Sequence, residues 1–147
     1  MARAEQTLTV AQIAEINRRM IEEFGGFFAG NDNLANPGSL EHVLAAIQGS
    51  LFGRELYPTL TEKAAAIGWR IIVGHVFHDG NKRTGMEACR LFLDLNGFDM
   101  RIDHEVISMA LSLATGESSF ADFVAWVERR TTARASQNAI QEPPAST

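Results

Sequence analysis

Cysteine and long apolar runs are almost missing from this chain of 147 residues. Its single cysteine, Cys89, excludes an internal disulfide. The surrounding Ala88, Leu91 and Phe92 indicate a buried, unreactive thiol rather than a catalytic nucleophile. No apolar run approaches the length of a membrane span, and the first residues lack the apolar stretch of a secretory signal. We therefore expect a cytoplasmic protein without a membrane partner.

The chain also lacks an excess of basic residues. Lys and Arg together number 13 against 18 Asp and Glu, which gives a formal net charge of −5. Proteins that bind nucleic-acid backbones usually carry the opposite balance, so we expect no direct nucleic-acid partner. The cations Lys82, Arg83 and Arg90 lie close together in the sequence, which predicts a local positive potential suited to a small anion.

The spacing of apolar residues predicts helices through most of the chain, enough for one domain with a buried core. The first helix is expected over residues 9–24 and the second from Pro37. Capping signals predict a third helix from about residue 60 to Phe77. A fourth is expected from Asn81 to residue 96, and capping signals near residues 103 and 119 predict two more.

Two segments do not fit the helical pattern. Residues 25–33 are rich in Gly and Asn around Phe27 and Phe28, which predicts a loop or a short hairpin. From residue 132 onward the chain is mostly small and polar, so it lacks the apolar surface that would order it. We expect one domain over residues 1–131 and a disordered tail over residues 132–147.

Residues 75–85 read His-Val-Phe-His-Asp-Gly-Asn-Lys-Arg-Thr-Gly and carry most of the chemical information. They lie between two apolar helices. A turn that leads into a helix N-terminus beside fixed cations is typical of a phosphate-binding site. Small residues in both flanking helices, Gly85 above all, predict that the two backbones approach closely and hold this turn rigidly.

Each polar residue of the motif has a predicted role. His75 is expected to act as a general base, and it should share a helix face with Asp79 if the third helix continues to Phe77. Asp79 is expected to hold Mg²⁺ or to orient a substrate hydroxyl, although it could instead cap the next helix or pair with Arg83. We expect phosphate contacts from the four residues that follow, with capping as an alternative for the amide: Gly80, Asn81, Lys82 and Arg83. A zinc site at His75 and His78 lacks further ligands.

The motif resembles the signature of the Fic/Doc (Fido) family, roughly His-x-Phe-x-Asp/Glu-Gly/Ala-Asn-Gly/Lys-Arg. Seven positions match at the family spacing: His75, Phe77, Asp79, Gly80, Asn81, Lys82 and Arg83. The likeness extends over roughly residues 7–130. It implies an all-α fold, a single Fido-type domain of about six helices, with residues 25–30 in the position of the family's substrate-docking flap.

Two positions favour the Doc (death-on-curing) branch of the family. Lys82 stands where the AMP-transferring branch has Gly, and Met86 stands where that branch has a second Arg. The Doc branch implies a toxin that moves the γ-phosphate of ATP, with Mg²⁺, to a hydroxyl of a protein such as elongation factor Tu and so arrests growth. Gly80 is the choice of the AMP-transferring branch, so AMP transfer remains the alternative, and a catalytically inactive binding module is a second one.

The resemblance also implies a partner. Many relatives carry an inhibitory helix with the pattern Ser/Thr-x-x-x-Glu-Gly/Asn. No Glu in this sequence is followed by Gly or Asn. We therefore expect a separate cognate antitoxin, supplying a helix that covers the groove.

Overall fold

The computed structural model describes residues 5–51 and 54–134, and this part of the chain is built from helices. The described ranges contain six α-helices, a 3₁₀ turn η1 (Asn31–Asn33) and four short strands. The helices are α1 (Val10–Phe24), α2 (Pro37–Gln48), α3 (Leu60–Gly74), α4 (Asn81–Leu95), α5 (Glu105–Thr115) and α6 (Phe120–Arg130). The predicted all-α class with six helices is confirmed. None of the described helices is long and apolar enough to span a membrane.

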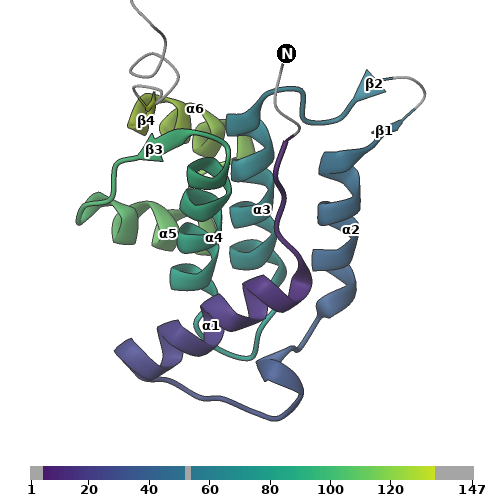
Figure 1. Ribbon diagram of the computed structural model, residues 1–147. Coiled ribbons are helices and arrows are strands. Elements are labelled where there is room, and N and C mark those ends of the chain that lie inside the picture. The colour runs from purple at the N-terminus through teal and green to yellow at the C-terminus, as the bar shows by residue number, and fades with distance from the viewer. Residues whose placement is uncertain (1–4, 52–53, 135–147) are drawn as a thin grey trace, which may run out of the picture.

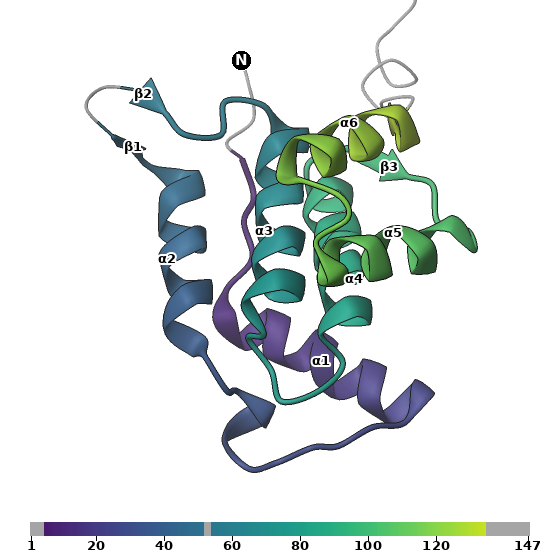
Figure 2. The same cartoon turned by 180° about the vertical axis from the view of Figure 1, so that it is seen from behind.

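Helices α3 and α4 form the centre of the molecule and run antiparallel side by side (Figures 1 and 2). Helix α2 covers α3 on one flank, and α5 and α6 lie on the other side of the pair. Helix α1 crosses α4 near the end of the pair where the chain turns from α3 into α4. The turn that carries the sequence motif is therefore held between the central pair and α1.

The two central helices touch through small residues, as their sequences predict. A Cβ added to Gly85 of α4 would lie 2.9 Å from the carbonyl oxygen of Gly68 in α3 and 2.6 Å from Cγ1 of Ile72. No side chain fits at such distances, so glycine is required at position 85. The fully buried Ala64, Ala65 and Ala88 extend this close packing along the pair. The contact fixes both helix ends that border the motif.

Reciprocal capping boxes begin three of the helices. Thr59 accepts a hydrogen bond from the N–H of Glu62 at the start of α3, and Ser119 accepts one from Asp122 at the start of α6. Both boxes were predicted from the sequence. Thr9 and Gln12 form a third box at the start of α1. Each box pairs N–H groups that a helix leaves free at its first turn.

Two strand pairs depart from the purely helical expectation. Strand β1 (Ser50–Leu51) pairs with β2 (Arg54–Glu55), and β3 (Phe98–Met100) pairs antiparallel with β4 (Thr131–Ala133). The second pair includes residues 132 and 133, which belong to β4 although they were predicted to be disordered. Arg134 forms ion pairs with Asp94 and Asp99. The prediction of a disordered tail is therefore wrong for residues 132–134, and its remaining part, residues 135–147, lies outside the described residues.

Candidate active site

His75 does not continue α3, which was predicted to reach Phe77. The helix ends at Gly74, and His75 follows in the left-handed conformation with φ 48° and ψ 54°. The expected shared helix face of His75 and Asp79 is thus wrong. The sharp turn instead places the imidazole at the surface, where it borders a cavity. A residue other than glycine in this conformation carries strain of a kind often found at functional sites.

The motif loop, residues 75–80, is held by hydrogen bonds to its backbone. The carbonyl of Val76 accepts hydrogen bonds from the N–H groups of Ala35 and Asn36, at 2.8 and 3.0 Å. The N–H of His78 donates to the carbonyl of Asn33 at 2.9 Å. Val76 and Phe77 are buried beneath the loop, so their side chains anchor it to the core. These contacts give the loop one defined shape.

Asn81 has a different task from the one predicted. Its side-chain oxygen accepts from the N–H of Phe77 at 2.9 Å, and its side-chain nitrogen donates to the carbonyl of Phe77 at 2.7 Å. The amide is therefore engaged by the loop backbone rather than directed at a ligand. It is also not the N-cap of α4, because Gly80 occupies that position. Asn81 shapes the loop, and any phosphate contact from this residue would come from its backbone N–H.

Asp79 links the motif loop to the segment after α1. Its Oδ2 accepts a hydrogen bond from the N–H of Phe27 and its Oδ1 accepts one from Gly80, each at 2.8 Å. These two bonds, that of Phe27 first, lower the pKa of the Asp79 carboxyl below its ordinary value. The side chain is exposed and ionised at neutral pH. The structure records no ion pair between Asp79 and Arg83, so that alternative is not supported by the described contacts.

Gly80 allows the backbone to turn directly into α4. Its φ is 79°, and an added Cβ would lie 3.0 Å from both the side-chain nitrogen of Asn17 and Cδ1 of Ile21. The first intrahelical bond of α4 runs from Thr84 to the carbonyl of Gly80. Within the described residues, the backbone N–H groups of residues 81–83 have no acceptor. A helix start with free N–H groups is suited to binding an anion.

A cavity of about 350 Å³ opens above this helix start. It brings together every predicted site residue in its lining: His75, Asp79, Gly80, Asn81, Lys82 and Arg83. His78 also borders it, together with Met20 and Ile21 of α1. The imidazole, the carboxylate and two cations thus share one hollow with the free end of α4.

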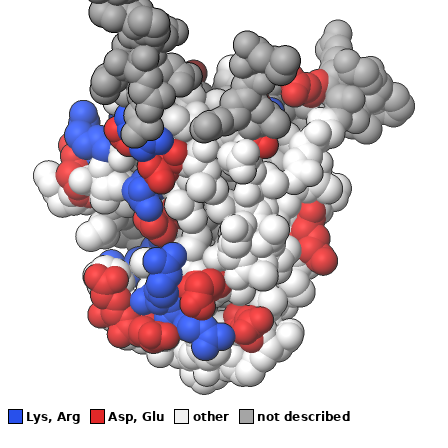
Figure 3. Space-filling model, in the orientation of Figure 1, with Lys and Arg blue, Asp and Glu red and all other residues white. Residues whose placement is uncertain are grey.

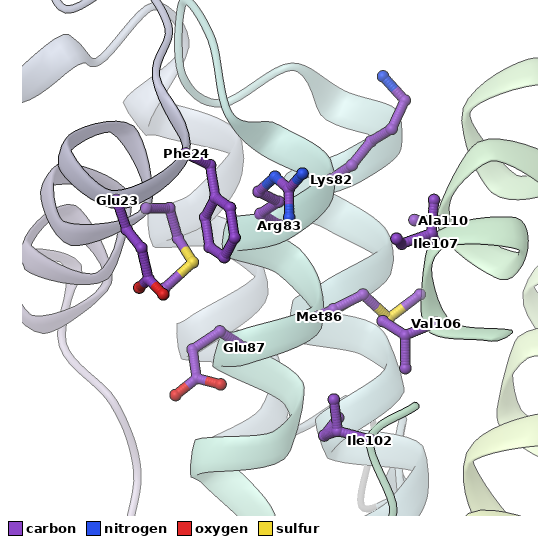
Figure 4. A pocket seen from close by; sticks show the side chains of 11 residues that line it. Glu23, Phe24, Lys82, Arg83, Met86, Glu87, Ile102, Val106, Ile107 and Ala110 are labelled. Carbon is purple, nitrogen blue, oxygen red and sulfur yellow. The ribbon is translucent and has the colours of Figure 1, made fainter. Parts of the chain in front are cut away.

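A second cavity, of about 330 Å³, adjoins the first through Met20, Lys82 and Arg83. Its walls come from α1, α4 and α5 and are mainly apolar (Figure 4). The guanidinium of Arg83 lies 3.8 Å from the centre of the Phe24 ring, and Lys82 extends away from this cavity. Met86 points across the cavity toward Val106 of α5. Position 86 thus contributes an apolar side chain to the wall of this cavity.

Two other sequence predictions around the site have clear outcomes. Arg90, which was grouped with the motif cations, forms a bidentate ion pair with Glu87 and borders neither cavity. Cys89 is buried, and burial raises the pKa of its thiol to about 12, which confirms an inert cysteine. On the face shown in Figure 3, basic and acidic side chains alternate without a broad basic surface. Among the described residues, no group of three potential metal ligands gathers.

The segment 25–30, named the flap segment here, is an extended loop rather than a hairpin. Phe27 and Phe28 are 62% and 39% exposed, so neither ring is buried in the core. The ring of Phe27 meets the ring of His78 edge to face, with centroids 6.3 Å apart. An exposed aromatic segment therefore lies along the edge of the cavity.

Sequence reasoning missed two buried amides behind the site. Asn17 and Asn33 are both fully buried, and the side chain of Asn33 donates to that of Asn17 at 3.0 Å. A signal existed for Asn17, which occupies a core position four residues after Ile13 in an otherwise apolar stripe. Asn33 gave no such signal, because it lies in a segment where Asn is expected in turns.

Comparison with known proteins agrees with this geometry. The profile of the Fic/DOC family matches residues 7–93. The chain is 35% identical over 79 residues to the toxin Doc of Mycolicibacterium smegmatis. The aligned region covers 54% of this chain and 61% of that protein. It is 32% identical over 98 residues to the protein kinase doc of Escherichia phage P1, covering 65% of this chain and 77% of that protein. The match to the mycobacterial toxin thus spans less than two thirds of its length. The chain belongs to the Fic/DOC family.

Proposed function

We propose that this protein is a Doc-like toxin that transfers the γ-phosphate of ATP to a hydroxyl group of a protein. One observation carries the proposal: an exposed imidazole, two cations and the free N–H groups of a helix start share one cavity. The two Doc relatives, one named a toxin and the other a protein kinase, support the same reading.

In this proposal His75 accepts the proton of the attacking hydroxyl. Imidazole suits proton acceptance near neutral pH, and the surface position of His75 leaves it open to a protein substrate. The γ-phosphoryl group forms a bond to the hydroxyl oxygen while its bond to the β-phosphate oxygen breaks, and ADP leaves. Lys82, Arg83 and the N–H groups of residues 81–83 would neutralise the transferring charge.

Asp79 is the residue that would hold Mg²⁺. Each of its oxygens accepts one backbone hydrogen bond and keeps a second lone pair, and the lowered pKa keeps the group ionised. Mg²⁺ is commonly held by one or two carboxylates together with substrate phosphates, so a single carboxylate fits. When bound with the nucleotide, the ion would offset negative charge on the phosphates. The chain's own residues supply the orientation and the proton acceptor.

The rival chemistry is AMP transfer within the same site. Gly80 matches the AMP-transferring branch and keeps this alternative open. Against it, Lys82 fills the position where that branch has Gly, and Met86 lies in an apolar wall where that branch has a second Arg. The exposed His75 also argues against a catalytically inactive module. We therefore favour phosphate transfer.

A cognate antitoxin follows as the proposed partner. The apolar cavity between α1, α4 and α5 is open to the surface, and Phe24 and Ile107 at its edge are 51% and 63% exposed. A helix from the antitoxin laid across this groove would cover these side chains and close the neighbouring phosphate cavity. The protein substrate that we expect is a translation factor such as elongation factor Tu.

The direct test uses ATP labelled at either the α or the γ position. The chain is incubated with Mg²⁺, labelled ATP and purified elongation factor Tu, and a cell lysate serves as a second source of acceptors. We expect label from the γ position on an acceptor protein and none from the α position. The variant His75→Asn serves as the matched control and should leave the acceptors unlabelled.

Label from the α position would refute phosphate transfer and establish AMP transfer instead. Labelling that survives in His75→Asn would refute the role given to the imidazole. Label on lysate proteins but not on elongation factor Tu would keep the reaction and reject the proposed target.

A further inference from the structure

The buried pair Asn17 and Asn33 joins three segments that lie far apart in the sequence. Asn17, in α1, donates from its side-chain nitrogen to the carbonyl of Asp79 at 2.8 Å and to Oγ1 of Thr84 at 3.0 Å. Its side-chain oxygen accepts from Asn33. One amide thus connects α1, the motif loop with the adjoining first turn of α4, and the η1 turn that follows the flap segment.

Asn33 holds the flap segment itself. Its side-chain oxygen accepts from the N–H of Ala29 at 2.9 Å, and its side-chain nitrogen donates to the carbonyl of Phe27 at 3.1 Å. Its own carbonyl accepts from His78 in the motif loop. The residue adopts a left-handed conformation with φ 62°, which brings these groups together.

Both amides are fully paired although they are fully buried. A buried amide without partners is costly, and a core needs no amides for stability alone. A complete polar network instead imposes one geometry on the groups that it joins. Here those groups are the flap backbone on one side and the motif backbone on the other. The network therefore fixes the distance between the flap backbone and the motif backbone.

We propose that Asn33 is a positioning residue that, braced by Asn17, sets the flap segment beside the motif loop so that a protein substrate can dock there. The inference rests on the proposed function for its kinetic part only. Within the flap segment, the N–H of Phe27 donates to Asp79, so the position of the flap and that of the motif carboxylate are coupled. Neither asparagine lines the nucleotide cavity, and the flap segment borders it only at Gly25, so displacing the flap should act mainly on docking of the acceptor protein.

The test compares Asn33→Gly with Asn31→Gly. Glycine accepts the left-handed conformation at both positions, where φ is 62° and 61°, so backbone strain is matched. Asn31 is exposed, and its side chain makes no hydrogen bond to any residue that the structure describes. The pair of variants therefore isolates the buried amide of Asn33.

The first readout is amide hydrogen exchange of Phe27, followed by NMR. Its N–H is bound by Asp79 and not by Asn33, so faster exchange reports displacement of the whole flap. Loss of one buried hydrogen-bonded amide predicts about tenfold faster exchange in Asn33→Gly and no change in Asn31→Gly. Equal exchange in the two variants would overturn the proposal.

The second readout is the kinetics of transfer. Asn33→Gly should raise KM for the acceptor protein about tenfold, and it should change kcat and KM for ATP less, because neither asparagine lines the nucleotide cavity. A rise in KM for ATP as large as the rise in KM for the acceptor, or a loss confined to kcat, would overturn the docking role. If the unmodified protein transfers nothing to any acceptor, the proposed function fails, while the exchange experiment still decides whether Asn33 holds the flap.

A second variant covers the case in which Asn33→Gly does not fold. Asn33→Asp keeps the shape and the acceptor for Ala29 but loses the donors to Phe27 and Asn17. It should speed exchange at Phe27 more than at Ala29. Equal protection at Phe27 in this variant and in the unmodified protein would contradict the proposal.

Discussion

The α3–α4 pair is held in two different ways along its length. Around Gly68 and Gly85 the helices touch through small apolar residues, and nothing larger fits. At the end that carries the motif, buried side chains give way to hydrogen bonds on the backbone, supplied by Asn81, Asn33 and Asp79. The first region is fixed by volume and the second by directed polar contacts.

This difference separates stability from chemistry. The packed region tolerates no added atom, so changes there should act mainly on the free energy of unfolding. The motif end is exposed at His75 and Asp79, so changes there should act mainly on transfer. The strained, left-handed backbone of His75 lies at the motif end, and the stability of the packed region permits this strain.

The largest expected effect comes from His75→Gly. Loss of a general base should reduce transfer by about 10²–10⁴-fold. The free energy of unfolding should change by less than about 1 kcal/mol, because glycine relieves the left-handed strain but gains freedom in the unfolded chain. Transfer rates and urea denaturation of the same preparation measure both quantities.

His75→Asn is the control for this prediction, since Asn tolerates the left-handed conformation and cannot act as the base. Both variants should lose transfer equally. A large loss of stability in His75→Gly, with activity lost in proportion, would show that the two regions are not separable.

The next effect comes from the packed region. Gly85→Ala should lower the free energy of unfolding by about 1–3 kcal/mol, because its Cβ would meet backbone and Ile72 atoms at 2.6–2.9 Å. Thermal and urea unfolding measure the loss. Transfer by the fraction that remains folded should stay near normal if packing and chemistry are separate.

Gly38→Ala is the matched control in α2, where an added Cβ meets nothing within 4 Å. Alanine is the better helix former, so this variant should gain up to about 1 kcal/mol. A loss at both glycines would mean that space at position 85 is not the reason for the glycine.

Sequence patterns captured the packed region better than the motif end. Helical spacing, capping boxes and small residues are local signals, and they predicted the helices and the close contact of α3 with α4. The left-handed turn at His75 has no such signal, because the pattern Ile71 to Phe77 is equally compatible with a longer helix. Hydrogen bonds from other segments hold the backbone out of the helix there, among them those of Val76 to residues 35 and 36 and that of His78 to Asn33.

The candidate site shows the same limit of prediction from sequence. The motif spacing predicted which residues gather in the cavity, and the structure brings all six together. It could not predict how their polar atoms are used. The amide of Asn81 binds the backbone of Phe77 in the same loop, and the carboxylate of Asp79 accepts a hydrogen bond from Phe27 in the distant flap segment. Strands β3 and β4 were missed for a similar reason, since each is three residues long and stable only through the other.

The smallest expected effect concerns Asn81, which belongs to the motif end but acts on structure. Asn81→Ala leaves the N–H and carbonyl of buried Phe77 without their partner and should lower the free energy of unfolding by about 1 kcal/mol. Asn81→Asp keeps the acceptor and places a negative charge favourably at the start of α4, so urea denaturation should show a smaller loss.

The negative charge of Asn81→Asp would also repel phosphate, so binding of Mg²⁺-ATP should weaken more in Asn81→Asp than in Asn81→Ala. Equal nucleotide affinity in the two variants would place the phosphates away from this helix start.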